Sequence, residues 1–138
     1  MQITGHKNFK IVVALVLIND SDEILLSKRP KNKHLGGFWE FPGGKVETGE
    51  VPEIALIREI REELDININN KCIAPLSFSE FDYNNFQLLL LLYICRRWDG
   101  VPMSMENNKL EWVKPNMLRD YKMPPADDAL IYCLQDLF

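Results

Sequence analysis

The chain has 138 residues, of which 46% are hydrophobic and 26% are charged, so it has the size and balance of one globular domain. A formal net charge of -4 argues against a broad nucleic-acid-binding surface, because neutralising many phosphates requires an excess of lysine and arginine. We therefore expect a single domain over residues 1–138 that binds no nucleic acid polymer, although a small phosphorylated ligand is compatible with a bound metal ion.

The apolar runs and the cysteines indicate a cytoplasmic protein without membrane segments. Residues 11–18 and 88–95 are each far shorter than the roughly 20 residues that a membrane-spanning helix needs. Turn residues at 19–22, rather than a small-residue cleavage site, follow the first run, which argues against a signal peptide. The cysteines lack metal-ligand spacing, which favours reduced core residues at Cys72, Cys95 and Cys133.

The order of the predicted elements indicates a mixed α/β or α+β fold. Runs rich in β-forming residues predict strands, in chain order, over residues 10–18, 23–28, 38–41, 72–82, 86–97 and 111–114. Turn residues 19–22 join the first two strands as a predicted hairpin. Two helices, over 52–64 and 125–137, lie far apart in the chain. This pattern predicts a mixed sheet with a helix against each face.

The helix predicted over 52–64 begins with a favourable proline and a poor cap. Pro52 suits the first helical position, where its missing N–H costs nothing, whereas Val51 before it offers no side-chain acceptor. Counting roughly 100° per residue places the apolar side chains on one broad arc. The members of this arc are Ile54, Leu56, Ile57, Ile60 and Leu64.

Three glutamates of the same helix form an acidic strip beside the apolar arc. Glu59, Glu62 and Glu63 stand at i, i+3 and i+4, where like charges repel by a few tenths of a kcal/mol per pair. One interpretation is a solvated face supported by an Arg58–Glu62 pair. The other is a site for Mg²⁺ or Mn²⁺, which prefer hard oxygen ligands. The glycine turn just before the helix favours the metal interpretation, because glycine lets backbone groups approach an ion closely.

The segment from Gly44 to Ile66 resembles the Nudix box. That box reads Gly, five residues, Glu, seven residues, Arg-Glu, aliphatic, any, Glu-Glu, any, Gly, aliphatic. The matching residues are Gly44, Glu50, Arg58, Glu59, Ile60, Glu62, Glu63 and Ile66. Asp65 stands where the box has its second glycine. A looser similarity to the MutT-type subgroup extends over roughly residues 10–137, through "GGFWEFPGGKVE" before the box and "PPADDALI" after it.

This resemblance implies an α/β/α sandwich around a mixed sheet and a divalent-metal site. It implies that Glu59, Glu62 and Glu63 bind Mg²⁺, with Mn²⁺ as the alternative, helped by the backbone carbonyl of Gly43. It also implies that Arg58 orients the glutamates. Glu50 would hold the loop against the helix, and Gly44 belongs to the same motif. The resemblance also implies a further acid from a late loop. Glu106, six residues before Trp112, is the expected acid, and Glu111 is the alternative.

The resemblance also implies substrate-binding residues, each with a simpler alternative. Arg29 and Lys45 are candidates for phosphate contacts, or are ordinary surface cations. Phe41 packs on a base, or is a core residue. The last of these candidates, Asp127 and Asp128, recognise a base, or cap the final helix. For the two histidines, His6 and His34, we expect loop positions without a catalytic role.

The function that the resemblance implies is metal-dependent hydrolysis of a nucleoside triphosphate to a monophosphate and pyrophosphate. The expected substrates are oxidised nucleotides such as 8-oxo-dGTP, in a sanitising role. The alternatives are CTP or a modified dCTP, a Nudix-like module that binds nucleotides without cleaving them, and a lesion-reading domain. The expected protein is a cytoplasmic monomer or homodimer.

Asp65 departs from the Nudix box and calls for a separate prediction. Glycine at this place ends the helix in the left-handed conformation, which aspartate also visits at a cost of about 1 kcal/mol. We therefore predict a positive φ for Asp65 at the helix C-terminus and a carboxylate outside the metal shell.

Overall fold

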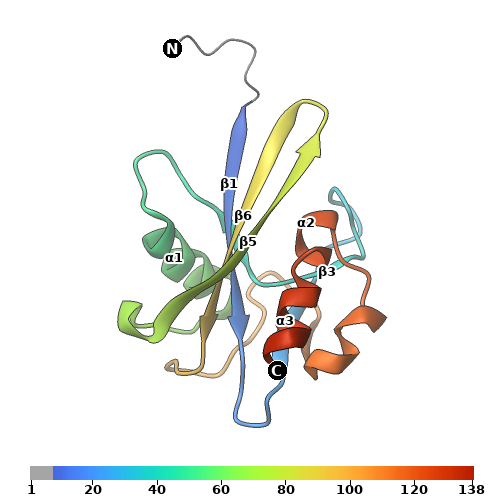
Figure 1. Cartoon of the computed structure of the whole chain (residues 1–138). Coiled ribbons are helices and arrows are strands. Elements are labelled where there is room, and N and C mark those ends of the chain that lie inside the picture. The colour runs from blue at the N-terminus through green and yellow to red at the C-terminus, as the bar shows by residue number, and fades with distance from the viewer. Residues whose placement is uncertain (1–7) are drawn as a thin grey trace.

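The computed structural model describes residues 8–138 and contains two β-sheets flanked by helices (Figure 1). The larger sheet has the strand order β4-β1-β6-β5. Its strands are β1 (Phe9–Leu17), β4 (Gly43–Lys45), β5 (Ile73–Tyr83) and β6 (Phe86–Cys95). It is a mixed sheet, because β1 runs parallel to β6 while the other two pairs are antiparallel.

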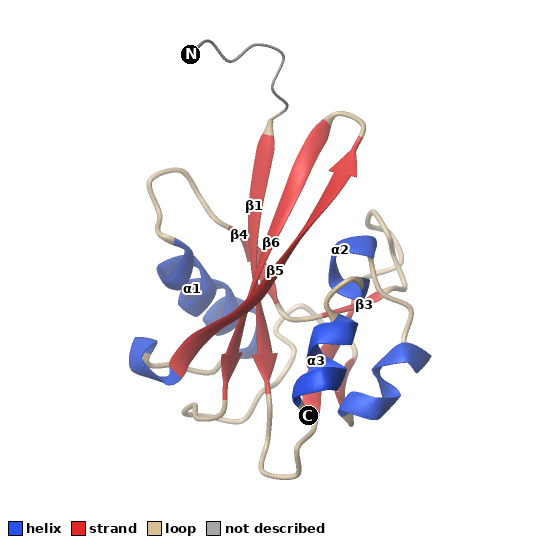
Figure 2. Ribbon diagram, viewed as in Figure 1, coloured by secondary structure: helices blue, strands red, loops and turns tan. Residues whose placement is uncertain are grey.

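A second, smaller sheet has the order β3-β2-β7, and all its pairs are antiparallel. It contains β2 (Ile24–Lys28), β3 (Trp39–Glu40) and β7 (Leu110–Val113). The helices are α1 (Pro52–Leu64), α2 (Pro125–Asp128) and α3 (Ile131–Leu137), with 3-10 turns η1 (Asn70–Cys72) and η2 (Pro115–Asp120). Figure 2 shows α1 on one side of the larger sheet and α2 and α3 on the other. The expected mixed α+β fold with layered helices is confirmed.

The alternation of side chains along β1 explains why both faces of the sheet need a helical layer. Val13, Leu15 and Leu17 pack in one core cluster with α1 residues such as Leu56. The intervening residues of β1 face a second cluster with α2 and α3. All nine residues of β1 pair with β6, so the strand lies in the middle of the sheet. A strand that is apolar on both faces is stable only when both faces are covered.

The predicted hairpin between the first two strands is wrong in its pairing, although its turn forms. The Asn19 side chain accepts hydrogen bonds from the N–H groups of Ser21 (3.0 Å) and Glu23 (2.9 Å). Beyond an isolated bridge between Ile18 and Ile24, the two strands belong to different sheets. The reason is that β4 and β6 already occupy both edges of β1.

Helix α1 confirms the predicted positive φ of Asp65 and corrects the prediction for Ile54. Val51 makes no side-chain cap, as expected, and Asp65 ends the helix with φ 55° and ψ 38°. Ile54 is 54% exposed rather than buried, whereas Ala55 beside it is fully buried. The apolar arc is therefore displaced toward Ala55 in the first turn.

The final helical segment also differs from its prediction. Residues 125–137 form two short helices, α2 and α3, instead of one, with the interruption at Ala129 and Leu130. Both helices still place buried residues against the sheet, among them Ala126 and Ile131.

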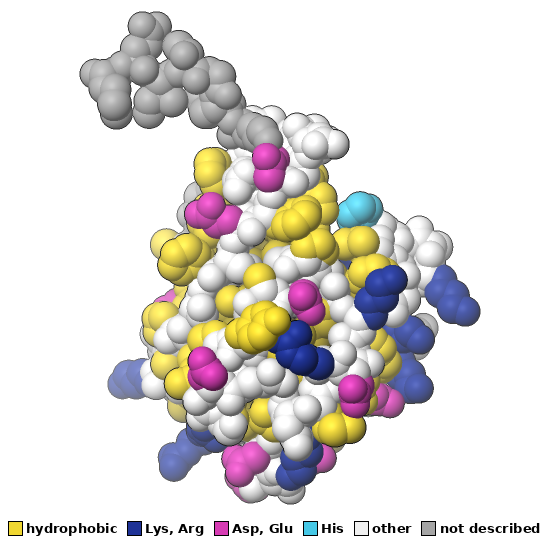
Figure 3. Space-filling model, turned by 45° about the vertical axis from the view of Figure 1, so that its right-hand side comes forward, with side chains coloured by type: hydrophobic (Ala, Val, Ile, Leu, Met, Phe, Trp, Pro, Cys, Tyr) yellow, Lys and Arg dark blue, Asp and Glu magenta, His cyan; other side chains and the backbone are white. Residues whose placement is uncertain are grey.

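The side chains on the face shown in Figure 3 and the state of the cysteines bear on the expectations about charge, membranes and reduced thiols. Basic, acidic and apolar side chains are mixed over the face shown in Figure 3. Within residues 8–138, no helix combines the length and the apolar character needed to cross a membrane. All three cysteines are free thiols, but only Cys95 is fully buried, while Cys72 and Cys133 are half-buried. His6 lies outside the described residues.

Candidate active site

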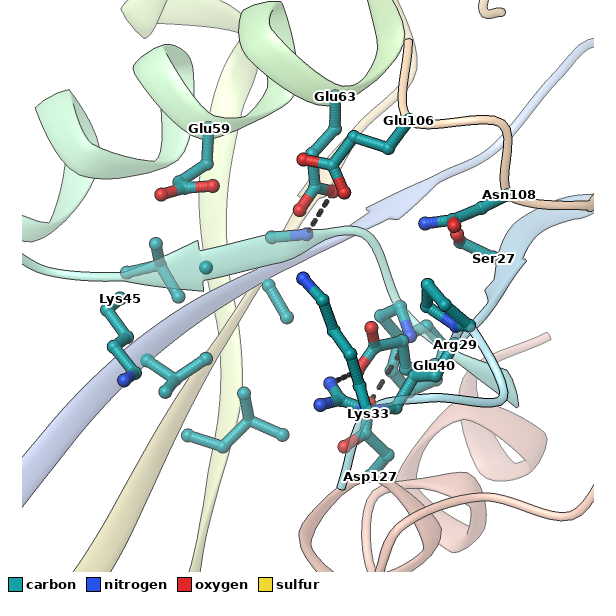
Figure 4. A pocket seen from close by; sticks show the side chains of 18 of the residues that line it. Ser27, Arg29, Lys33, Glu40, Lys45, Glu59, Glu63, Glu106, Asn108 and Asp127 are labelled. Atoms are coloured by element: carbon teal, nitrogen blue, oxygen red, sulfur yellow. Dashed lines mark hydrogen bonds and ion pairs between the residues drawn. The ribbon is translucent and has the colours of Figure 1, made fainter. Parts of the chain in front are cut away.

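A cavity of about 480 Å³ opens between α1, the β3–β4 region and the loops around residues 29–37 and 106–108 (Figure 4). Acidic side chains dominate its wall. They are Glu40, Glu47, Glu59, Glu63, Glu106 and Asp127. Three cationic side chains, Arg29, Lys33 and Lys45, also line it.

The glycine turn brings backbone directly against two carboxylates of α1. The N–H of Gly43 donates to Glu63 Oε2 at 3.3 Å. A Cβ on Gly44 would lie 2.7 Å from Glu59 Oε1, so that only glycine leaves room for this carboxylate. Because β4 is paired to β1, the turn is held in place by the sheet. The turn and α1 therefore form one wall of the cavity.

The carboxylates are crowded without enough positive charge to balance them. Burial, followed by repulsion from Glu40, Glu59 and Glu106, raises the pKa of Glu63 to about 8. Burial also raises the pKa of Glu59, although the hydrogen bond from Arg58 opposes this effect. Such a cluster is where a bound cation would relieve the most repulsion.

Arg58 joins the loop before α1 to the glutamates of the helix. Its guanidinium donates two hydrogen bonds to the Glu50 carboxylate, at 2.8 and 2.9 Å, and one to the Lys45 carbonyl at 3.0 Å. Nη1 donates to Glu59 at 2.8 Å and to Glu62 at 3.4 Å. These contacts connect the loop to the helix and fix one side of the Glu59 carboxylate.

The Arg58–Glu50 pair predicts a pH-dependent stability. The hydrogen bonds from Arg58 lower the pKa of Glu50 from 4.5 to about 2. A carboxyl whose folded-state pKa is lowered stabilises the fold above its unfolded pKa and loses that contribution as the pH falls. Glu50→Gln should therefore flatten the dependence of Tm on pH between about 4.5 and about 2, compared with the unmodified chain. Thermal denaturation followed by circular dichroism across that range measures this, and parallel curves for the two proteins would contradict it.

The two candidates for the late acid occupy different environments. The N–H groups of Met103 and Met105 donate to the carbonyls of Leu64 and Glu63, at 3.1 and 2.9 Å. This pairing ties the late loop to the end of α1 and brings Glu106 beside Glu63 in the cavity (Figure 4).

Glu111, by contrast, accepts a hydrogen bond from the Tyr121 hydroxyl at 2.6 Å. It does not line the cavity. The structure therefore favours Glu106 over Glu111.

Glu62 and Asp128 lie outside the cavity. The Glu62 side chain is 59% exposed and contacts Arg58 on the outer side of α1. Asp128 is exposed beside the buried Asp127. Their assignments to metal and base binding stay predictions that the cavity does not support.

Phe41 and Asp127 are joined at the inner end of the cavity. Phe41 is only 3% exposed and belongs to the core cluster, which favours the simpler alternative for its side chain. Its N–H donates to Asp127 Oδ2 at 3.2 Å. Burial, followed by repulsion from Glu40, raises the pKa of Asp127 to about 8. The surroundings of Asp127 thus favour the neutral, protonated form of its side chain.

A second cavity of about 550 Å³ adjoins the first and differs from it in chemistry. Many of its lining side chains are aromatic or aliphatic, among them His34, Leu35, Tyr83, Phe86, Leu88 and Leu90, and the polar side chains of Lys10 and Asn85 also line it. The rings of Tyr83 and Phe86 are stacked with centroids 5.0 Å apart. Arg29, Glu40, Lys45 and Asp127 line both cavities. A polar, acidic cavity therefore adjoins one that is lined by several rings and has more apolar surface. His34, which we expected to have no catalytic role, is a loop residue at the edge of the second cavity.

The model of the NUDIX domain family matches residues 13–132 of the chain. The chain belongs to the Nudix family.

Several Nudix proteins are similar to the chain along most of its length. It is 32% identical to the 8-oxo-dGTP diphosphatase of Escherichia coli K12, covering 95% of this chain and 99% of that protein. It is also 32% identical to the CTP pyrophosphohydrolase of the same organism, covering 88% of each. Among solved structures, a MutT from work on Aliivibrio salmonicida and Vibrio cholerae has a TM-score of 0.81 at 35% identity, covering 95% of this chain and 100% of that one. These findings make the chain a MutT-like Nudix hydrolase.

The donor set of this Nudix site fits a hard divalent cation that keeps much of its water. Among residues 8–138, no three His, Cys, Asp or Glu side chains are grouped closely enough to hold an ion by themselves. Mg²⁺ is commonly bound through one or two carboxylates, with waters and substrate phosphates completing its shell. Glu59, Glu63 and Glu106 offer oxygen ligands of that kind around a roomy cavity. The residues present therefore fit a divalent metal that binds together with a phosphorylated substrate.

Sequence reasoning missed several residues that the fold brings to the Nudix cavity. Glu40 accepts a hydrogen bond from Arg29 Nη1 at 2.9 Å and contributes to the raised pKa of Glu63. Lys33 and Asn108 also line the cavity, from two loops that are distant in the chain. In the sequence, Glu40 is only an acid between two aromatic residues of a short strand. The composition of the two loops likewise gives no reason to select Lys33 or Asn108.

Proposed function

We propose that this Nudix hydrolase cleaves nucleoside triphosphates to a nucleoside monophosphate and pyrophosphate, with Mg²⁺ as its metal and oxidised nucleotides such as 8-oxo-dGTP as substrates. The observation that carries the proposal is the junction of the two cavities. A carboxylate-lined cavity suited to metal-bound phosphates opens into a ring-lined cavity suited to a base. This is the division that a nucleotide substrate requires.

In the proposed mode of binding, the triphosphate lies in the acidic cavity and the nucleoside in the ring-lined one. Tyr83 and Phe86 supply aromatic surface on which a base can stack. Arg29 and Lys45 line both cavities and are therefore placed near the phosphate closest to the nucleoside. The metal ligands are Glu59, Glu63 and Glu106, with Gly43 and Glu62 as the further candidates.

The chain's own residues orient the reaction and accept its proton. A divalent metal, when bound, would offset phosphate charge and lower the pKa of water. Arg58 holds Glu59 at 2.8 Å, which orients that carboxylate toward the cavity. A carboxylate of the cluster takes the proton from the attacking water. Glu63 and Glu106 both face the cavity beside the proposed metal site, so either carboxylate is placed to accept this proton.

Base recognition rests on Asp127 in this proposal. Its neutral form can both donate and accept a hydrogen bond, whereas a carboxylate can only accept. Because burial raises the pKa of Asp127, the neutral form is favoured near neutral pH. An oxidised purine, which presents additional carbonyl and N–H groups, would use both capacities. A pyrimidine triphosphate is the second candidate, because the CTP pyrophosphohydrolase of Escherichia coli is also 32% identical to the chain, over 88% of its length.

A panel of triphosphates, normal and oxidised, tests the proposed substrate. We expect pyrophosphate release in magnesium buffer and a kcat/KM for 8-oxo-dGTP that exceeds the value for dGTP by more than about tenfold, which is roughly 1.4 kcal/mol. A smaller ratio would refute the sanitising role, and a higher kcat/KM for CTP or a modified dCTP would establish the second candidate. Binding of all triphosphates without pyrophosphate release would indicate a nucleotide-binding module instead.

A further inference from the structure

Lys33 projects into the acidic cavity from the loop that connects β2 to β3. Figure 4 shows its ammonium between the Glu63 side of the cavity and the side formed by Arg29, Glu40 and Asp127. Within residues 8–138, the Lys33 side chain makes no hydrogen bond or ion pair, although its charge opposes the rise in the pKa of Glu40. It is a cation facing a cavity with an excess of carboxylates, in a protein whose proposed substrate is a polyanion.

The backbone of the loop holds Lys33 at this place. The Lys33 N–H donates to the Pro30 carbonyl at 3.2 Å, and the Gly36 N–H donates to the Lys33 carbonyl at 2.9 Å. The Gly37 N–H closes the loop by donating to the Arg29 carbonyl at 2.9 Å. A Cβ on Gly36 would lie 2.7 Å from the Pro30 carbonyl oxygen, so this compact turn requires glycine there. The base of the Lys33 side chain is therefore fixed, and only its flexible stem remains to adjust to a ligand.

The other two cations of the cavity, Arg29 and Lys45, differ from Lys33 in their partners or in their position. Arg29 donates through Nε to the His34 carbonyl at 2.9 Å and through Nη1 to Glu40 at 2.9 Å. Lys45, at the end of β4, lies apart from Lys33 in Figure 4 and lines the second cavity as well as the first. Lys33 is thus placed to reach the middle of a bound phosphate chain without first breaking a side-chain contact.

We propose that the Lys33 ammonium contacts the substrate phosphates between the ring-lined cavity and the carboxylate cluster, and stabilises the phosphate that leaves with the nucleoside. This inference rests on the proposed function. In the reaction, the water oxygen bonds to the β-phosphorus, and the bond from that phosphorus to the oxygen shared with the α-phosphate breaks. The electron pair stays on that oxygen, the water's proton passes to a carboxylate, and negative charge grows where Lys33 lies. A nearby cation stabilises this growing charge in the transition state more than in the ground state.

Lys33→Met tests this role, with Lys33→Arg as the conservative variant and Lys31→Met as the matched control. Lys31 belongs to the same loop and is exposed, but does not line the cavity. We expect Lys33→Met to lower kcat on the order of ten- to a hundredfold, with a smaller change in KM. Lys33→Arg should restore most of the rate. Lys31→Met should match the unmodified protein, and all variants should keep its Tm.

A binding measurement separates phosphate contact from a general effect on the loop. Calorimetry with an α,β-methylene nucleoside triphosphate, which cannot be cleaved at that bond, should show weaker binding to Lys33→Met than to Lys31→Met. Binding of the unphosphorylated nucleoside should be equal for the two variants. Equal kcat for Lys33→Met and Lys31→Met would overturn the role of Lys33. If the unmodified protein released pyrophosphate from no triphosphate, the proposed function itself would fail.

Discussion

Replacing Glu63 with glutamine should lower kcat by about 10²- to 10⁴-fold in magnesium buffer while leaving the fold intact. The carboxylate is half-buried in the cavity wall, accepts the Gly43 N–H and has a pKa raised to about 8. Glutamine keeps the size and the acceptor oxygen but removes the negative charge and the basicity. Glu59→Gln should have a comparable effect, because its carboxylate occupies the space that Gly44 leaves open.

The matched control is Glu53→Gln, in the first turn of the same helix. Glu53 does not line the cavity, so its substitution should leave kcat unchanged. The measurement is pyrophosphate release at saturating nucleotide, with Tm recorded for each variant. The carboxylate mechanism would be wrong if Glu59→Gln and Glu63→Gln both turned over at nearly the normal rate.

Alanine at Gly43 and at Gly44 should damage the protein in two different ways. A Cβ at Gly43 would lie 2.8 Å from the Cα of Ala14 and closer still to the Val13 carbonyl, so that backbone must move. We expect Gly43→Ala to lower the free energy of unfolding by about 1–3 kcal/mol or more, since the clash cannot be relieved by a side chain. The β4–β1 pairing is the part of the sheet that it would disturb.

At Gly44 the obstructing atoms belong to the flexible end of Glu59 instead. Gly44→Ala should therefore displace this carboxylate and lower kcat on the order of a hundredfold, with a smaller loss of stability. Chemical denaturation and kinetics on the two variants measure the contrast. The reverse pattern, with Gly44→Ala unfolded and Gly43→Ala active, would show that the steric account of this turn is mistaken.

The acidic helix could be predicted because its information is local in the chain. The spacing of Glu59 and Glu63, the proline start and the stop at Asp65 depend on residues within one helix and the turn before it. The positive φ at Asp65 followed from the small number of residue types that adopt that conformation. Such features require no knowledge of distant parts of the fold.

The remainder of the site depends on contacts between distant segments, which no local pattern contains. Glu40 reaches the carboxylates only because β3 pairs with β2 in a separate sheet, whereas the sequence predicted one mixed sheet. Lys33 enters the cavity through a loop whose composition is that of any exposed polar turn. The burial of Phe41 likewise depends on α2, which is 84 or more residues further along the chain.

The N–H groups of Met103 and Met105 donate hydrogen bonds to the last carbonyls of α1. The end of this helix and the late loop should therefore unfold locally as one unit. Local unfolding in proteins tends to involve contiguous segments that separate together. Fraying of the last turn of α1 would release the late loop, and release of the loop would expose the carbonyls of Glu63 and Leu64. Glu63 and Glu106 are therefore lost or retained together, although 43 residues separate them in the chain. The segments that carry the two acids should thus have the same free energy of local unfolding.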